Sequence, residues 1–254
     1  MNLPPFIHKQ YFDSLIYGSG FKPYAEFTPN DKLSYRSTEL TKFKLLFETD
    51  DTVYKNKRIL DLGSHHGYLA YIVRYLGADS VHGINILNLS TAAANFAFSQ
   101  MNQTNYLFET GDIENQSFLE QACKDKDTVM LCEILGGIKN PVSVLSTITD
   151  SSIDAMMFEG GIYSEYGQPA LYYSTRDTTN RSQAGIPDHN NMGRVEVQSI
   201  PNLPWLTTML YYFGWRIEHL EVTHDFTPEW FAMPKLAEAP RVAHNAHILA
   251  RKFK

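Results

Sequence analysis

The residues whose types and spacing could do chemistry gather around one turn that carries two glycines. Asp61 stands two places before Gly63, and Ser64 and His65 follow before the second glycine, Gly67. A carboxylate can hold a cationic group, and glycines let backbone N–H groups approach a ligand without a Cβ in the way. A helix that starts directly after the turn would add the partial positive charge of its N-terminus. The pattern indicates a turn that cradles a nucleotide.

The apolar residues on both sides of the turn predict the elements that must position it. Residues 59–62 form an apolar strand before the turn, and residues 80–86 predict a second strand after it. Between the strands, Gly77 ends a helix whose apolar face has the spacing i, i+3, i+4, i+7; the face consists of Leu69, Ile72, Val73 and Leu76. This compact βαβ unit predicts the opening of a Rossmann-like sheet.

Two common nucleotide-binding motifs do not fit the turn. A dinucleotide fingerprint, G-x-G-x-x-G, would need glycines where His65 and Tyr68 stand. A phosphate-binding P-loop needs Gly-Lys-Ser/Thr, which the sequence lacks. The remaining pattern, D-x-G-x-x-x-G, resembles the class I S-adenosylmethionine-dependent methyltransferases. The commonest form of that family has a further glycine where this chain has His65.

The resemblance implies S-adenosyl-L-methionine as the cofactor. Asp61 would face the amino group of its methionine part, inside the turn of Gly63, Ser64, His65 and Gly67. At the end of the second strand, where the family carries an acid for the ribose hydroxyls, this chain has Asn85, followed by Ile86; Asn88 is the alternative. An amide oxygen still accepts a hydrogen bond, but exchanging a charged acceptor for a neutral one loses roughly 1 kcal/mol.

A Gly-Asp-hydrophobic segment after the third strand completes the cofactor site that the resemblance implies. There Asp112 would bind the adenine amino group and Ile113 would cover the ring. Residues 127–135 predict a fourth strand, and its carboxyl end should place Glu133 beside the sulfonium and the methyl acceptor. Residues 153–159 predict a fifth strand that ends at Glu159.

The last third of the chain predicts the closure of the sheet. An apolar helix over 205–213 has Asn202 as its cap and Gly214 as its end, and residues 216–222 and 247–253 suit an antiparallel pair. The expected fold is therefore α/β, a Rossmann-like class I methyltransferase sheet. We expect it to be mostly parallel with an antiparallel last strand and helices on both faces.

Two additions to the core are rich in aromatic residues. We expect residues 1–58 to form an N-terminal cap on the acceptor side, and residues 59–254 to form the methyltransferase core with an insertion at about 160–200. The acceptor must reach the methyl group over the carboxyl edge of the sheet, so both additions are candidate walls of the acceptor pocket. The alternative is a plain surface elaboration.

The reaction would transfer a methyl group to an oxygen or nitrogen atom, and a hydroxyl acceptor would need a base. The candidate bases are Glu133 and Glu159 at strand ends, then His189 and His224 on predicted loops. Glu133 leads by its position, although a solvated or salt-bridged carboxylate would also suit that place. Each histidine alone is as consistent with a surface or packing role.

Composition narrows the partners and the location. The net charge of −6 in 254 residues weighs against broad nucleic-acid binding, and no stretch reaches about eighteen apolar residues, so no membrane partner is expected. The first residues lack a secretory signal, and Cys123 and Cys132 suit buried thiols better than a disulfide. We expect a cytoplasmic protein. Metal binding is not expected, because no compact carboxylate or cysteine set accompanies the histidines at ligand spacing.

The acceptor stays open between classes. A small molecule is favoured, and DNA is not, because no Asp/Asn-Pro-Pro-Tyr segment follows the fourth strand. Residues 131–141 and 200–215 also resemble, at low specificity, the group of tRNA wobble-uridine carboxymethyl-transferring enzymes, which makes RNA a less favoured partner. A catalytically inactive S-adenosylmethionine-binding partner protein is the other alternative, given Asn85 and His65. The oligomeric state is left open by the sequence.

Overall fold

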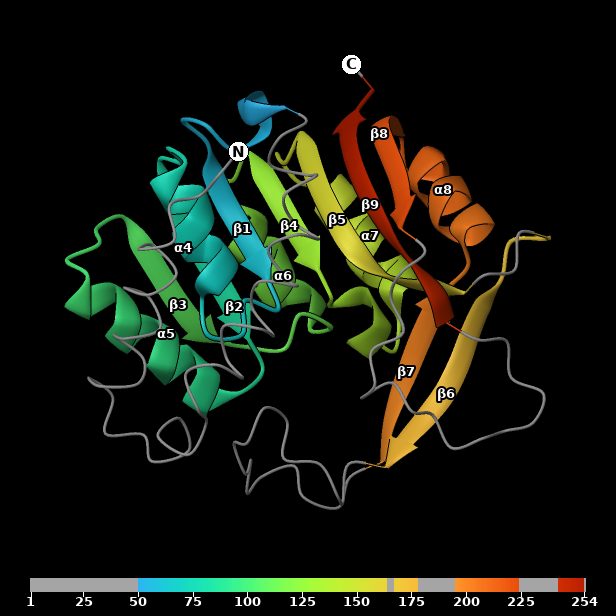
Figure 1. The fold of residues 1–254 in the computed structure, drawn as a ribbon, viewed down its shortest axis with the longest axis horizontal. Helices are drawn as coiled ribbons and strands as arrows, with labels where there is room; N and C mark the ends of the chain where they lie inside the picture. Colours follow the sequence, from blue (N-terminus) through green and yellow to red (C-terminus); the bar gives the residue numbers. More distant parts are fainter. Residues whose placement is uncertain (1–49, 164–166, 178–194, 224–241, 254) are drawn as a thin grey trace.

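A seven-stranded sheet forms the centre of the protein (Figure 1). The computed structural model describes residues 50–163, 167–177, 195–223 and 242–253. The strands lie in the order β3-β2-β1-β4-β5-β9-β8. Their bounds are β1 Arg58–Leu62, β2 Ser80–Asn85, β3 Tyr106–Thr110, β4 Thr128–Cys132, β5 Ala155–Tyr163, β8 Trp215–Thr223 and β9 Val242–Lys252.

The sheet is parallel except for one strand. β1 pairs in parallel with both β2 and β4, and the outer pairs β2–β3 and β4–β5 are also parallel. β9 runs antiparallel to both of its neighbours, β5 and β8. The prediction of a mostly parallel sheet with an antiparallel last strand is confirmed, and the predicted closing pair corresponds to β8 and β9.

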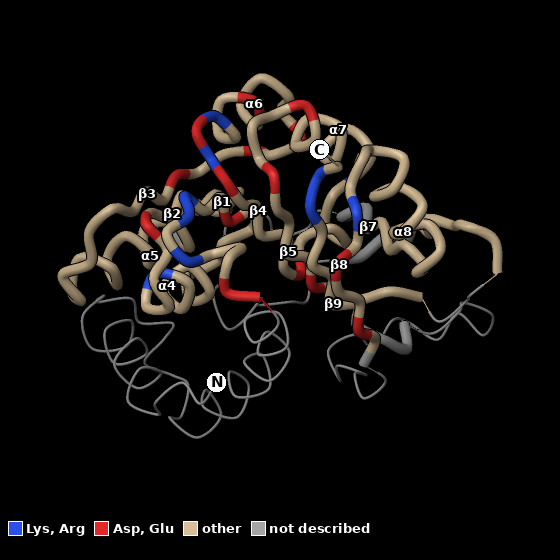
Figure 2. The backbone as a smooth tube through the Cα atoms, turned by 90° about the horizontal axis from the view of Figure 1, so that it is seen from above, with Lys and Arg blue, Asp and Glu red and all other residues tan. Residues whose placement is uncertain are grey.

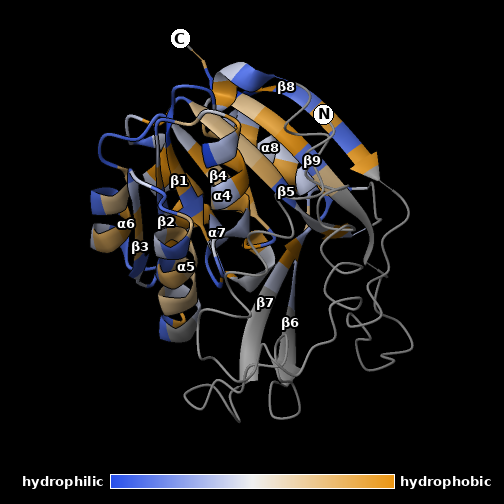
Figure 3. Ribbon diagram, turned by 60° about the vertical axis from the view of Figure 1, so that its left-hand side comes forward, coloured by the Kyte–Doolittle hydropathy of each residue, from blue (hydrophilic) through white to orange (hydrophobic). Residues whose placement is uncertain are grey.

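Helices cover both faces of the sheet, as expected. α4 (Tyr68–Tyr75) and α5 (Asn88–Gln100) pack on one face, together with a short 3-10 turn at Asp51–Val53. α6 (Gln116–Cys123), α7 (Pro141–Thr149) and α8 (Leu203–Tyr212) pack on the other, where a second 3-10 turn, Leu135–Gly137, follows β4. Figure 3 shows the apolar strands enclosed between these helices. Two separate apolar clusters result, one on each side of the sheet.

The helix predicted at 205–213 is α8, and its cap is the predicted one. The Asn202 side chain accepts a hydrogen bond from the Trp205 amide at 2.9 Å, which satisfies an N–H that the helix leaves without a partner. Gly214 follows the helix with φ +79°, a conformation that glycine adopts without strain. Local sequence signals therefore determine both ends of α8.

The predicted end of the fifth strand is wrong. β5 begins at Ala155 and continues to Tyr163, four residues past Glu159, because β9 supplies an antiparallel partner along the whole of it. Glu159 pairs in register with Cys132 of β4 and with His247 of β9, so it lies in the middle of its strand. The strand pairing across distant parts of the chain overrides the apparent local end.

The segment after β5 contributes a separate two-stranded antiparallel ribbon, β6 (Leu171–Asp177) and β7 (Val195–Pro201). In Figure 1 it extends from the end of the sheet at which the parallel strands finish. The Ser199 hydroxyl donates to the carbonyls of Ile138 at 2.6 Å and Leu135 at 3.3 Å, and so ties β7 to the loop after β4. Residues 1–49 of the expected N-terminal cap and the histidines His189 and His224 lie outside the described residues.

Candidate functional site

The parallel strands bring the predicted cofactor residues to one edge of the sheet. Asp61 lies near the end of β1, Asn85 ends β2, Asp112 follows β3, and Glu133 follows β4. Since these four strands are neighbours and parallel, their carboxyl ends and the loops after them meet at the same edge. This is the edge at which ligands bind in open α/β sheets.

Asp61 is the most unusual residue of this edge. Its side chain is 2% exposed, and its Oδ2 atom has no hydrogen-bond partner in the part of the chain that the structure describes. Burial raises the pKa of this carboxyl group to about 7, because the charged form loses its hydration. A buried acid in this state would gain from a cationic partner.

The two glycines of the turn allow close packing, and their backbone N–H groups donate within the protein instead of pointing to a ligand. The amides of Gly63 and Ser64 both donate to the Ile84 carbonyl, at 2.9 and 3.0 Å, and the Gly67 amide donates to the Ser64 carbonyl at 2.7 Å. A Cβ on Gly63 would lie 2.8 Å from an Ile134 atom. Gly63 also has φ +78°, so it allows both the turn and the close packing of Ile134.

Gly67 serves packing in the same way. It precedes α4 with φ +80°, and a Cβ there would lie 2.9 Å from Phe108 and 3.1 Å from Ala94. Phe108 also fills the space above Gly83 of β2, where a Cβ would lie 2.4 Å from its ring. The role of Gly83 could not be predicted from the sequence, because it depends on an aromatic side chain from the adjacent strand β3.

His65 and Glu133 share a backbone conformation that is uncommon for such residues. Their φ angles are +48° and +55°, and each stands in a loop at the carboxyl edge. The other non-glycine residues with positive φ in the described ranges are all Asn or Asp, in loops before β1, β3 and β4: Asn56, Asn102, Asn105 and Asp125. Left-handed conformations of this kind cost free energy and tend to occur at ligand-binding places.

The ring of His65 is partly exposed and packs on its neighbour His66, which is 2% exposed. The two ring centroids lie 3.7 Å apart, with the ring planes at 71°. His65 is therefore a partly accessible imidazole on the turn, held from one side by a buried one.

The second strand ends at a buried amide, Asn85, and an exposed apolar residue, Ile86, follows it. Asn85 is 8% exposed, and its Oδ1 atom accepts a hydrogen bond from the Leu87 amide at 2.8 Å. One lone pair of that oxygen is therefore already used by the chain's own turn, while Ile86 is 64% exposed. The exposed side chain of Ile86 offers an apolar surface on which a purine ring could pack.

The two residues predicted to bind adenine, Asp112 and Ile113, differ in their exposure to solvent. Asp112 is exposed, and its Oδ1 atom accepts from the Glu114 amide at 2.9 Å. Ile113 is almost fully buried in the cluster beneath α6 and α7, so most of its surface serves the core. Of this pair, only Asp112 has a side chain well open to solvent.

The loop after β4 holds the leading candidate base, Glu133, within reach of solvent. Glu133 is exposed, and its amide donates to the Glu159 carbonyl at 2.7 Å. Glu159 is completely buried, beside Cys132 on one strand and the equally buried His247 on the other. The sequence predicted His247 only as the start of a closing strand, because its register with Glu159 cannot be read from one sequence.

The thiol of Cys132 shows that the acids of this edge lie close together. Burial raises its pKa well above the ordinary value, and the negative charges of Glu159, Asp61 and Glu133 raise it further. Asp61 and Cys132 lie on the same side of the sheet, the side that α4 and α5 cover. The sheet is thus acidic around the ends of β1 and β4 and the adjoining middle of β5.

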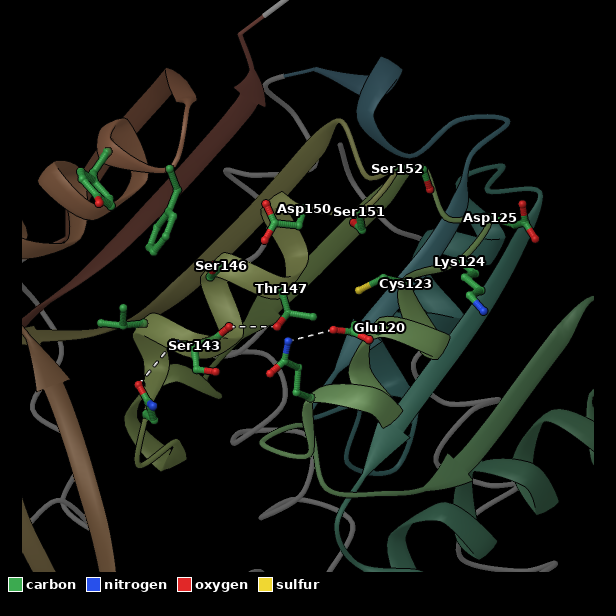
Figure 4. Close-up of a pocket in the computed structure, with 15 residues that line it drawn as sticks. Glu120, Cys123, Lys124, Asp125, Ser143, Ser146, Thr147, Asp150, Ser151 and Ser152 are labelled. Atoms are coloured by element: carbon green, nitrogen blue, oxygen red, sulfur yellow. Dashed lines mark hydrogen bonds between the residues drawn. The ribbon is translucent and has the colours of Figure 1, made fainter.

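A groove elsewhere on the protein contains none of the predicted site residues. It has a volume of about 910 Å³ and lies between α6, α7 and the end of α8 (Figure 4). Its lining is mostly polar, and Figure 4 shows Glu120, Ser146 and Thr147 around it. Burial raises the pKa of Cys123, which also lines the groove, to about 11, so this thiol is a poor nucleophile.

Figure 2 shows lysines and arginines placed among acidic residues along the described chain. Within those ranges, no three His, Cys, Asp or Glu side chains are grouped so that they could hold a metal ion. None of the described helices is long and apolar enough to cross a membrane.

Comparison with known proteins places this fold. No family model and no curated protein matches the chain. Magnesium protoporphyrin IX methyltransferase (ChlM) from Synechocystis PCC 6803, solved with bound S-adenosylhomocysteine, is 14% identical, aligns over 98% of this chain and 97% of its own, and has a TM-score of 0.55.

Two further solved structures have comparable similarity. An S-adenosylmethionine-dependent methyltransferase from Mesorhizobium loti is 17% identical over 83% of this chain and 97% of its own, with a TM-score of 0.56. The cyclase SpnF is 16% identical over 82% of this chain and 79% of its own, with a TM-score of 0.58. Strand order, the single antiparallel strand and these similarities agree, so the chain has the fold of the class I S-adenosylmethionine-dependent methyltransferases.

Proposed function

We propose that the protein binds S-adenosyl-L-methionine at the carboxyl edge of the sheet and transfers its methyl group to an oxygen or nitrogen atom of a small molecule. The observation that carries this proposal is the buried Oδ2 atom of Asp61, which lacks a partner in the described structure and stands at the end of β1 in a methyltransferase sheet. A cationic amino group would stabilise the ionised form of such a buried carboxyl group. ChlM, which shares this fold, was solved with S-adenosylhomocysteine.

The residues at the edge suit the parts of the cofactor. Asp61 would hold the amino group, Asn85 the ribose hydroxyls and Asp112 the adenine amino group, while Ile86 would contact the adenine ring. Of these, Asn85 uses one acceptor position for the Leu87 amide and keeps its remaining hydrogen-bonding capacity for a ligand. When bound, the cofactor supplies an electrophilic methyl group, so positioning and exclusion of water are the main tasks of the protein.

The proton of the acceptor would pass to Glu133. This carboxylate is exposed at the end of β4, and the bond from its amide to Glu159 holds the backbone in place. Glu159 is buried and would act through its neighbours rather than touch the acceptor. His189, the third candidate base, lies outside the described residues and stays a prediction.

Two measurements, made one after the other, test the proposal. Calorimetric titration with S-adenosylmethionine and S-adenosylhomocysteine should show binding, and the Asp61→Ala variant should show none while keeping the wild-type circular dichroism spectrum. A library of small-molecule alcohols, acids and amines should then contain an acceptor that yields S-adenosylhomocysteine. Wild-type affinity in Asp61→Ala would refute the proposed orientation.

A cofactor-binding protein without methyl transfer is the second candidate. SpnF shares this fold and is named a cyclase, and His65 and Asn85 depart from the commonest residues of the resembled family. This candidate predicts cofactor binding without product from any acceptor. An RNA-modifying enzyme would instead show tRNA affinity that falls steeply with salt, and absence of that affinity at low salt would remove RNA from consideration.

We also infer a cytoplasmic location. Cys123 and Cys132 both carry free thiols, which is the usual state of cysteine in a reducing compartment.

A further inference from the structure

The proposed cofactor ends in an amino acid, which carries a carboxylate as well as an ammonium group. In the proposed orientation, Asp61 would bind the ammonium group and leave the carboxylate without a named partner. We propose that the imidazole of His65 donates a hydrogen bond to the carboxylate, so that Asp61 and His65 together clamp the zwitterionic end. This inference rests on the proposed function, and it assigns to His65 the recognition of the cofactor's carboxylate.

Three backbone N–H groups of the turn already donate hydrogen bonds within the protein. The amides of Gly63 and Ser64 donate to the Ile84 carbonyl, and the Gly67 amide donates to the Ser64 carbonyl. These three N–H groups already have good geometry within the protein, so turning them toward a ligand would break the turn itself. A side chain could donate to a carboxylate at this place without breaking these three hydrogen bonds.

Few side chains in the loops after β1, β2 and β3 could donate a hydrogen bond to the carboxylate as a cation. The described loops after β1, β2 and β3, residues 63–67, 86–87 and 111–115, contain no lysine or arginine. Their side chains that can become cationic are His65 and His66, and His66 is 2% exposed. His65 is the partly accessible one, and an imidazole donates a hydrogen bond in either its neutral or its charged form.

The backbone and the ring packing of His65 support a binding role. Its φ of +48° is a conformation that glycine would adopt without strain, so the side chain is retained at a cost in stability. The contact with the His66 ring, at 3.7 Å between centroids, limits the orientations of the imidazole. A donor that is already oriented loses less entropy when a ligand arrives.

The experiment compares two ligands that differ in the carboxylate alone. S-adenosylhomocysteine and its decarboxylated analogue are titrated by calorimetry against the wild type and His65→Gly. His65→Gly should lose about ten- to a hundredfold in affinity for S-adenosylhomocysteine, the usual effect of a hydrogen bond to a charged group. Its affinity for the decarboxylated analogue should stay within about twofold of the wild type, because that ligand offers nothing to His65.

A matched control separates binding from backbone strain. Asp125 also has a positive φ, +56°, and is exposed in the loop before β4. Asp125→Gly should raise thermal stability as His65→Gly does, and should leave both affinities unchanged. Thermal melts of each variant show that the fold is kept.

Each outcome decides between the two proposals. If the wild type binds neither ligand, the proposed function itself fails. If the wild type binds both and His65→Gly retains full affinity for S-adenosylhomocysteine, the role of His65 is refuted while the proposed function stands. An equal loss for both ligands would also refute it, because the change would then act through the shape of the turn.

Discussion

Replacing Asp61 by asparagine should stabilise the protein at neutral pH while it removes cofactor binding. The substitution keeps the shape of the side chain and deletes the charge that burial disfavours. Burial raises the pKa of Asp61 from 3.8 to about 7, whereas in the unfolded chain the carboxyl group is hydrated and returns to its ordinary value. The ionised residue is thus a local source of instability that the ligand would relieve.

The sign and size of the effect follow from linkage. A folded-state pKa above the unfolded value means that Asp61 contributes stability below about pH 4, which is lost as the pH rises through about 7. At about 1.4 kcal/mol per pKa unit, the full loss is about 4 kcal/mol, and about 3 kcal/mol of it falls between about pH 5 and 8.

Urea unfolding, followed by tryptophan fluorescence at half-unit steps from about pH 5 to 8, measures this loss. The stability of Asp61→Asn relative to the wild type should rise by about 3 kcal/mol over that range. Any constant cost of the buried amide shifts the whole curve and leaves its slope unchanged. A flat difference, or one that falls with pH, would refute the reasoning from burial.

Asp127, directly before β4, supplies the matched control, because the pKa of its carboxyl group is shifted in the opposite direction to that of Asp61. It accepts hydrogen bonds from Arg58 Nε at 3.0 Å, Nη2 at 2.9 Å and the Arg58 amide at 2.8 Å. Its pKa is lowered, chiefly by the hydrogen bond from the Arg58 side chain, so its contribution is present above about pH 4 and is lost only as the pH falls further. Asp127→Asn should therefore destabilise the protein by the same amount throughout the range from about pH 5 to 8.

Three further substitutions test the site. Gly83→Ala should destabilise the protein by about 1–3 kcal/mol in urea unfolding, because the new Cβ would lie 2.4 Å from Phe108, and an unchanged midpoint would contradict that packing. Asn85→Asp keeps the acceptor for the Leu87 amide and adds a charge, so calorimetry should show S-adenosylhomocysteine binding about three- to tenfold tighter; weaker binding would show that the ribose is not its partner. Glu133→Gly relieves the φ of +55° and should raise thermal stability by about 1 kcal/mol while methyl transfer falls by at least about a hundredfold; retained transfer would exclude Glu133 as the base.

Local patterns in the sequence were sufficient for the elements that open and close the sheet. The apolar run before Asp61, the helix spacing after Gly67 and the cap at Asn202 each depend on residues within one or two turns of each other. Such signals are physically local, so they predict β1, α4 and α8 with errors of one or two residues at the ends. The order of the motifs also predicted the topology that the strand pairing confirms.

Pairing between distant segments decided the length of β5 and the contacts of the ribbon, which the sequence alone could not predict. Glu159 lies in mid-strand because β9, from a part of the chain more than eighty residues later, pairs along all of β5. The hydroxyl of Ser199 ties the ribbon to the loop after β4, and nothing local to Ser199 indicates that bond.

The turn shows the same division at the scale of single atoms. Its sequence determines that Gly63 and Gly67 allow a tight reversal at the end of β1, because glycine adopts positive φ without strain. Only the tertiary structure decides that the carbonyl of Ile84, on the neighbouring strand, takes the amides of Gly63 and Ser64. The physical reason is that backbone conformation depends on the residue itself, whereas hydrogen bonds and burial depend on which strands become neighbours.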